Sequence, residues 1–132
     1  RPPRSTLFPY TTLFRSALPT SVRIYLSTFP VDMRKGCYTL SAFVRASGLD
    51  VYSGHLFVFF SKDRTRAKIL TWEHGGFVLY YKMLEKGRFR LPAFQEGQPT
   101  VLLEPAELAM LLNGFDYTQS KRPRLWTPPK KT

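Results

Sequence analysis

Closely spaced cations are the side chains of this sequence that could do chemistry most readily. Two groups of them lie in the middle of the chain, and several neighbours are two residues apart. They are Lys62, Arg64, Arg66 and Lys68, followed by Lys82, Lys86, Arg88 and Arg90. Because residues two apart in a β-strand share a face, Arg66 with Lys68 and Arg88 with Arg90 would line a ribbon that follows a phosphate backbone. The alternative is a solvated outer face whose charges prevent edge-to-edge strand pairing.

A second cationic feature is the run Arg34-Lys35-Gly36, which follows Asp32. The sequence predicts a helix that starts with Asp32 as its N-cap and ends at about Ala46. Cations in its first turn would oppose the helix dipole, and glycine there costs about 1 kcal/mol relative to alanine. Such local penalties often mark function, so we expect the helix start, Arg34 and Lys35 to hold an anion. The alternative is that Asp32 and another acid neutralise the pair.

The charge of the whole chain points in the same direction. Its 132 residues include 20 Lys and Arg against 9 Asp and Glu, a formal net charge of +11. A surplus of this size attracts polyanions such as nucleic acids. Charge by itself is equally compatible with a surface that only aids solubility, so the inference depends on how the cations are arranged.

Catalytic machinery is missing from the sequence. We find no Ser/His/acid set, no phosphate-binding glycine loop and no metal-ligand spacing, and the single Cys37 excludes an internal disulfide. Four carboxylates are candidates for a magnesium site: Asp32, Asp63, Glu73 and Asp116. Three of these are at capping, turn or helix-end positions that need no metal. We therefore expect no enzyme, no cofactor and no metal.

A small sheet is predicted to position the central cations. Alternation predicts strands at 22–26 and 88–91, and a run that is apolar on both faces predicts a core strand at 56–60. Two apolar runs flank the sequence Glu73-His74-Gly75-Gly76 and predict a β-hairpin over 66–82, because glycine takes the positive φ of a tight turn.

Apolar stripes at helical spacing predict two helices. The first stripe is Met33, Cys37, Leu40 and Val44, and the second is Leu108, Leu111, Leu112 and Phe115, in a helix that begins with Pro105. The fold expected from these elements is a single small α+β domain. It has an antiparallel sheet with a central β-hairpin and two short packing helices.

The ends of the chain differ in character from its middle. Residues 1–16 resemble the translation of a sequencing adapter and are expected to be disordered, and Pro9 argues against a signal peptide there. The domain is expected to span 17–117, followed by a basic, proline-rich tail at 118–132. No run approaches the roughly 20 apolar residues of a membrane span, so we expect a soluble, cytoplasmic protein that does not contact the membrane.

Six short motifs occur in a fixed order between residues 22 and 116. They are DMRKG at 32–36, SGHLFVF at 53–59, KILTW at 68–72, GF at 76–77, YKMLEKGRF at 81–89 and LAMLL at 108–112. In this order and spacing they resemble the TnpB accessory proteins of insertion sequence 66 elements. The resemblance implies a small bacterial protein that works beside a separate acid-triad transposase and has no known catalytic activity.

The expected function is therefore that of a non-catalytic accessory protein for DNA transposition, located at the nucleoid. The DNA, either transposon ends or target, is expected to contact ten cations: Arg34, Lys35, Lys62, Arg64, Arg66, Lys68, Lys82, Lys86, Arg88 and Arg90. The alternative is an interaction module that binds the transposase or a second accessory protein through an aromatic sheet surface and contacts DNA little.

Overall fold

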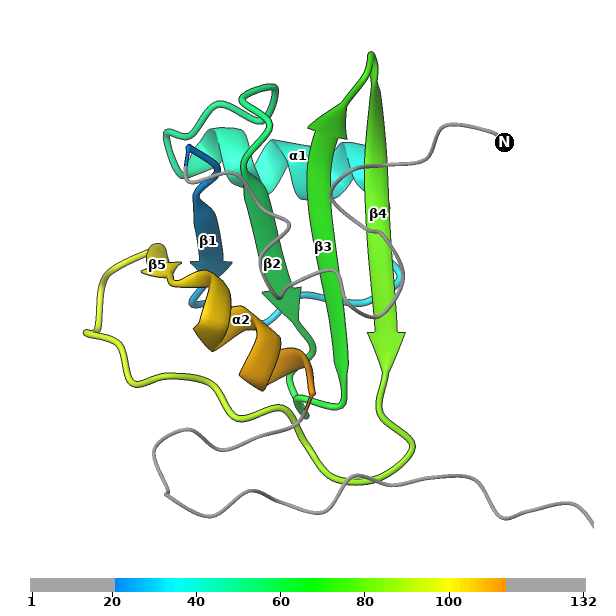
Figure 1. Ribbon diagram of the computed structural model, residues 1–132, viewed down its shortest axis with the longest axis vertical. Coiled ribbons are helices and arrows are strands. Elements are labelled where there is room, and N and C mark those ends of the chain that lie inside the picture. Colours follow the sequence, from blue (N-terminus) through cyan, green and yellow to red (C-terminus); the bar gives the residue numbers. More distant parts are fainter. Residues whose placement is uncertain (1–20, 114–132) are drawn as a thin grey trace, which may run out of the picture.

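Residues 21–113, the part of the chain that the computed structural model describes, form a five-stranded sheet with a helix packed against each face (Figure 1). The elements in chain order are β1 (Ile24–Ser27), α1 (Cys37–Ala46), β2 (Leu56–Phe60), β3 (Arg66–Glu73), β4 (Gly76–Met83), β5 (Thr100–Leu103) and α2 (Pro105–Leu112). In space the strands follow the order β4-β3-β2-β1-β5. The expected α+β class is confirmed.

The sheet is mixed, which corrects the expectation of an antiparallel one. β1 and β2 pair in parallel, with Ile24 opposite Leu56, whereas the other neighbouring pairs are antiparallel. Parallel neighbours need a long crossover, and α1 provides it by carrying the chain back across one face before β2 begins. Alternation within single strands does not reveal this direction.

The predicted β-hairpin is confirmed as β3 and β4, which pair along their whole length as far as Glu73 opposite Gly76, but it lies at one edge of the sheet and not at its centre. Its two turn residues have positive φ, 51° at His74 and 82° at Gly75. This conformation suits the tight turn of a hairpin, and glycine adopts it without a steric penalty. The hairpin brings Lys68 and Lys82 onto neighbouring strands.

The central strand β2 is buried on both faces, as its sequence predicted. On the side of α2, in front of the sheet in Figure 1, a core is formed by Ile24, Leu26, Leu56, Val58, Phe60, Ala67, Ile69, Phe89, Leu103, Leu108, Leu111 and Leu112. On the side of α1, a second core is formed by Met33, Leu40, Val44, Val51, Phe57, Phe59 and Leu70. Each face of the sheet is therefore covered by one helix, with a hydrophobic core between the sheet and that helix.

Residues after β4 depart from the predicted elements. The segment 88–91 is not a strand, although its expected alternation survives, since Phe89 is buried while Arg88 and Arg90 are exposed. The last strand, β5, was not predicted from the sequence, and it pairs with β1 at the opposite edge of the sheet from β4. Its sequence Thr100-Val101-Leu102-Leu103 does not alternate between apolar and polar residues, so it lacks the periodic signal of a strand with one exposed face.

The second helix begins as predicted. Pro105 is its first residue, and the backbone amide of Glu104 donates to the Glu107 carboxylate at 2.8 Å, which satisfies one main-chain donor at the helix start. The adapter-like segment 1–16, Phe115 and the basic tail 118–132 lie outside the described residues.

Candidate nucleic-acid interface

The turn between β2 and β3 is organised by Asp63. Its Oδ1 accepts hydrogen bonds from the Ser61 hydroxyl at 2.7 Å, the Thr65 hydroxyl at 2.9 Å and the Thr65 amide at 3.2 Å. These bonds stabilise the carboxylate and lower the pKa of Asp63 to about 2. The carboxylate is thus engaged within the turn, and the neighbouring Lys62 and Arg64 are exposed.

A second cationic segment, residues 84–90, is bonded directly to this turn. The Phe89 amide donates to the Arg64 carbonyl at 2.7 Å, and the Leu84 amide donates to the Thr65 carbonyl at 2.8 Å. The buried ring of Phe89 lies edge-on to Phe60, with 5.3 Å between ring centroids. Hydrophobic packing and main-chain hydrogen bonds thus hold together two segments that are distant in sequence.

Six of the predicted cations gather on these two segments, and all six are exposed. They are Lys62, Arg64, Arg66, Lys86, Arg88 and Arg90. They lie at the end of the sheet where β2 and β4 finish and β3 begins, lower in Figure 1. We call this group the basic end.

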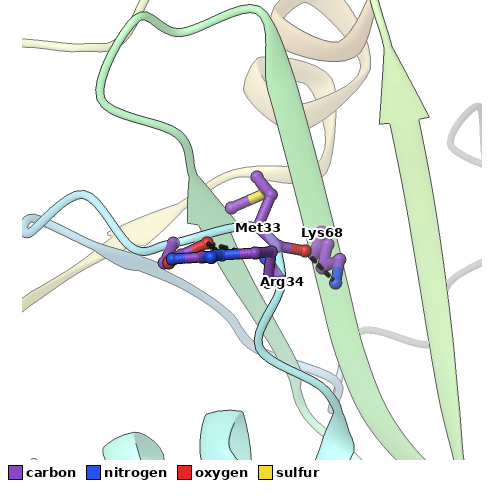
Figure 2. A network of polar contacts seen from close by, with 4 residues as sticks. Met33, Arg34 and Lys68 are labelled. Atoms are coloured by element: carbon purple, nitrogen blue, oxygen red, sulfur yellow. Dashed lines mark hydrogen bonds and ion pairs between the residues drawn. The ribbon is translucent and has the colours of Figure 1, made fainter.

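Lys68 does not lie on the surface, which corrects the expectation that it lines an outer ribbon with Arg66. Lys68 is 7% exposed, and its Nζ donates to the carbonyl of Met33 at 2.7 Å (Figure 2) and to the carbonyl of Lys35, also at 2.7 Å. The same ammonium lies 5.0 Å from the centroid of the Tyr81 ring on β4. Arg66 and Lys68 share a face as predicted, but α1 and the chain leading to it cover that face at Lys68.

The start of α1 also differs from the prediction, because the helix begins at Cys37 with Gly36 as an extended N-cap. In a helix that began at Asp32, the Met33 carbonyl would accept from the amide of Cys37. Lys68 occupies that carbonyl instead. The prediction that Asp32 caps the helix is therefore wrong, and Arg34 is not in a helical first turn.

Asp32 organises a separate turn ahead of the helix. Its Oδ1 accepts from the Arg34 amide at 2.9 Å, and its Oδ2 pairs with the Arg34 guanidinium at 2.6 Å (Figure 2). The guanidinium holds the pKa of Asp32 well below its usual range. The Arg34 side chain is 90% exposed, so the pair is on the surface. We call residues 32–36 the Arg34 turn.

The Arg34 turn lies beside the basic end. The amide of Val31, just before it, donates to the Phe60 carbonyl at 2.9 Å. An open hollow of about 520 Å³ separates the two features and is lined by Val31, Asp32, Met33, Ser61, Lys62, Asp63 and Arg66. With Arg34 and Lys35 included, the region presents eight exposed cations and three carboxylates, those of Asp32, Asp63 and Glu85.

Lys82 has an internal role. Its Nζ donates to the carbonyl of Leu112, the last residue of α2, at 2.6 Å. A cation at this position complements the negative end of the helix dipole. Burial lowers the pKa of Lys82. The side chain therefore ties α2 to the sheet and is not displayed beside the other cations.

In the part of the chain that the structure describes, two exposed cations fall outside the predicted runs, Arg23 before β1 and Arg45 in the last turn of α1. Neither has close cationic neighbours in sequence, so spacing gave no reason to select them. Arg23 precedes β1, which starts at the opposite end of the sheet from the basic end because β1 runs parallel to β2.

An uncharged groove of about 330 Å³ lies elsewhere, between β1 and the second half of α1. Its lining residues are Tyr25, Ser27, Phe29, Pro30, Val31, Phe43, Val44, Ala46, Ser47, Leu49, Phe57, Val58, Phe59, Pro99 and Thr100. Phe29 and Phe43 at this groove are exposed. The groove is thus chemically distinct from the basic end.

Within residues 21–113, no group of three or more His, Cys, Asp or Glu side chains could hold a metal ion. No helix in the same residues has the length and apolar character needed to cross a membrane.

Comparison with known proteins gives a family match over most of the chain. Residues 22–122 match the family described as IS66 Orf2 like protein. In Sinorhizobium fredii (strain NBRC 101917 / NGR234), Uncharacterized protein y4jC is 36% identical over 110 residues, which cover 83% of this chain and 92% of the relative. Uncharacterized protein y4hO of the same organism is 32% identical over 111 residues, which cover 83% of this chain and 93% of that relative. No solved structure matches the chain significantly.

Proposed function

The chain belongs to the IS66 Orf2-like family of transposition accessory proteins, and we propose that it serves transposition as a non-catalytic DNA-binding protein. The observation that carries this proposal is the convergence of eight exposed cations at one end of the sheet. They come from three separate segments, namely the β2–β3 turn with the start of β3, residues 84–90 and the Arg34 turn.

The arrangement suits a phosphate backbone better than base edges. Phosphate contacts by lysine and arginine supply affinity and position a protein on DNA, whereas bases are read from within the grooves by an inserted helix or strand. Five of the six cations of the basic end stand on a turn or on an irregular segment, and Arg66 is only the first residue of β3, so the group does not project as an element into a groove. The DNA would be transposon ends or target DNA, bound at the bacterial nucleoid.

A salt titration tests this proposal. Each phosphate contact with duplex DNA contributes about −0.9 to the slope of log K against log salt, so eight contacts give a slope of up to about −7. We expect steep loss of affinity between about 50 and 200 mM salt. A flat slope, or no binding of duplex or single-stranded DNA at the low end of this range, would overturn the proposal.

A second candidate function is docking of the element's transposase or of another accessory protein. The uncharged groove beside Phe29 and Phe43 favours it, because exposed apolar surface is typical of protein interaction sites. Replacing both phenylalanines by serine would then abolish transposase binding and leave the salt slope for DNA unchanged. Loss of DNA binding in this variant, with transposase binding intact, would argue against the groove as the docking site.

A further inference from the structure

Three parts of the molecule meet at the ammonium of Lys68. The Arg34 turn contributes the carbonyls of Met33 and Lys35, each 2.7 Å from Nζ, and β4 contributes the ring of Tyr81. Lys68 itself is on β3, opposite Phe59 on one side and Tyr81 on the other. A single charged group thus connects the sheet to the loop that displays Arg34.

The burial of this charge requires an explanation. Among residues 21–113 no carboxylate forms an ion pair with Lys68, so two peptide dipoles and an aromatic face compensate for the lost hydration. A buried ammonium is costly to desolvate, and an apolar side chain at such a position is often equally stable. Stability of the core is therefore a weak reason for lysine at position 68.

What lysine provides, and an apolar residue would not, is a fixed orientation of the Arg34 turn. By binding the Met33 and Lys35 carbonyls, Lys68 directs these two negative dipole ends toward the sheet. The side chains of Arg34 and Lys35 lie on the exposed side of the same turn. The solvent-facing side of the turn therefore displays the two cationic side chains, while the two carbonyl oxygens that could accept hydrogen bonds face away from it.

We infer that Lys68 is a positioning residue, which sets the Arg34 turn so that Arg34 and Lys35 engage the same DNA as the basic end. The inference rests on the proposed function, because it assigns to Lys68 an effect on DNA binding without contact with DNA. Its side chain is 7% exposed and so does not reach a phosphate.

A double-mutant cycle tests this role. At about 0.1 M salt one phosphate contact is worth about eightfold in affinity, so R34Q/K35Q should weaken duplex binding about 60-fold and flatten the slope by about 1.8. K68M, which keeps the length of the side chain and removes its donors, should weaken binding about tenfold and flatten the slope by about one contact. Added to R34Q/K35Q, it should cause less than about a twofold further loss, because interacting residues are not additive.

Three further variants control for effects on the fold. K82M removes a second lysine that donates to a carbonyl, one that is only partly buried, and should leave the slope unchanged. K68R retains charge and donors and should recover part of the affinity. Y81L removes the ring near the ammonium and should reproduce a smaller part of the K68M loss, which keeps the test open if K68M does not fold.

The outcomes separate the two proposals. Absence of duplex binding by the unaltered protein would overturn the proposed function and the role of Lys68 with it. Normal binding together with equal losses from K68M in both backgrounds, or an unchanged slope in K68M and Y81L, would overturn the role of Lys68 alone.

Discussion

The backbone amide of Phe89 donates a 2.7 Å hydrogen bond to the carbonyl of Arg64, and this bond joins the two cationic segments of the basic end. The ring of the same residue is buried against Phe60. One residue therefore couples the hydrophobic core to the arrangement of the charged surface, since Phe89 stands between the exposed Arg88 and Arg90.

The first prediction concerns this coupling. Phe89→Ala should reduce the free energy of unfolding by about 3–5 kcal/mol, the usual cost of truncating a buried phenylalanine, as measured by denaturant titration. At a temperature where the variant remains folded, the slope of log K against log salt for duplex DNA should flatten by up to the contribution of about three phosphate contacts. Phe94, which is 38% exposed, is the matched control, and its replacement by alanine should change stability by less than about 1 kcal/mol.

The second prediction concerns the cations of the basic end. Replacing Arg64, Arg66, Arg88 and Arg90 by glutamine should weaken binding about equally for all DNA sequences, because phosphates carry no sequence information. The salt slope should flatten by up to about 3.6, and melting temperature should change little. Arg23→Gln, at the other end of the sheet, is the control that should leave the slope intact. Equal slopes for the fourfold variant and the unaltered protein would show that the basic end is only a solvated face.

The third prediction concerns Asp32, the carboxylate that pairs with Arg34. D32N keeps an acceptor oxygen for the Arg34 amide but removes the charge that pairs with the guanidinium. We expect duplex affinity to rise and the salt slope to steepen by up to about 0.9, since one more cation becomes free for phosphate. The exposed Glu96 lies outside the basic end and the Arg34 turn, and E96Q should have a smaller effect. A fall in affinity for D32N would mean that the pair is needed to hold the turn.

The fourth prediction concerns pH. The Arg23 amide donates to Nδ1 of His55 at 3.0 Å, and burial followed by the nearby Arg23 charge lowers the pKa of His55 from its ordinary value of 6.5. Below pH 6.5 the unfolded chain therefore binds more protons than the folded one, and stability falls as pH decreases through this window until His55 is protonated in the folded state too.

Denaturant titrations between about pH 8 and pH 5 measure this dependence. H55N should flatten the dependence, because its amide does not titrate. H74N is the control, since His74 is exposed at a turn position with φ of 51° that asparagine tolerates, and it should leave the dependence intact. The same pH dependence in H55N and the unaltered protein would assign the effect to another group.

The predictable parts of the fold are those with local signals. The β-hairpin followed from a glycine turn between two apolar runs, β2 from a run that is apolar on both faces, and α2 from Pro105 with leucines at helical spacing. The gathering of six cations at the basic end was predicted only in part. Spacing indicated that neighbours share a face, but the hydrogen bonds that bring residues 84–90 to the β2–β3 turn connect segments distant in sequence.

By itself the sequence determined the composition of the surface, the family motifs and the elements whose periodicity is local. Only the tertiary structure decided which cations reach solvent. Alternation placed Lys68 beside Arg66 on one face of β3, yet that face is covered at Lys68 by the Arg34 turn and open at Arg66. The physical reason is that a strand's periodicity specifies two faces without specifying what packs on each. Long-range packing therefore buries Lys68, which was predicted to lie on the surface, and its ammonium donates a hydrogen bond to the loop before α1.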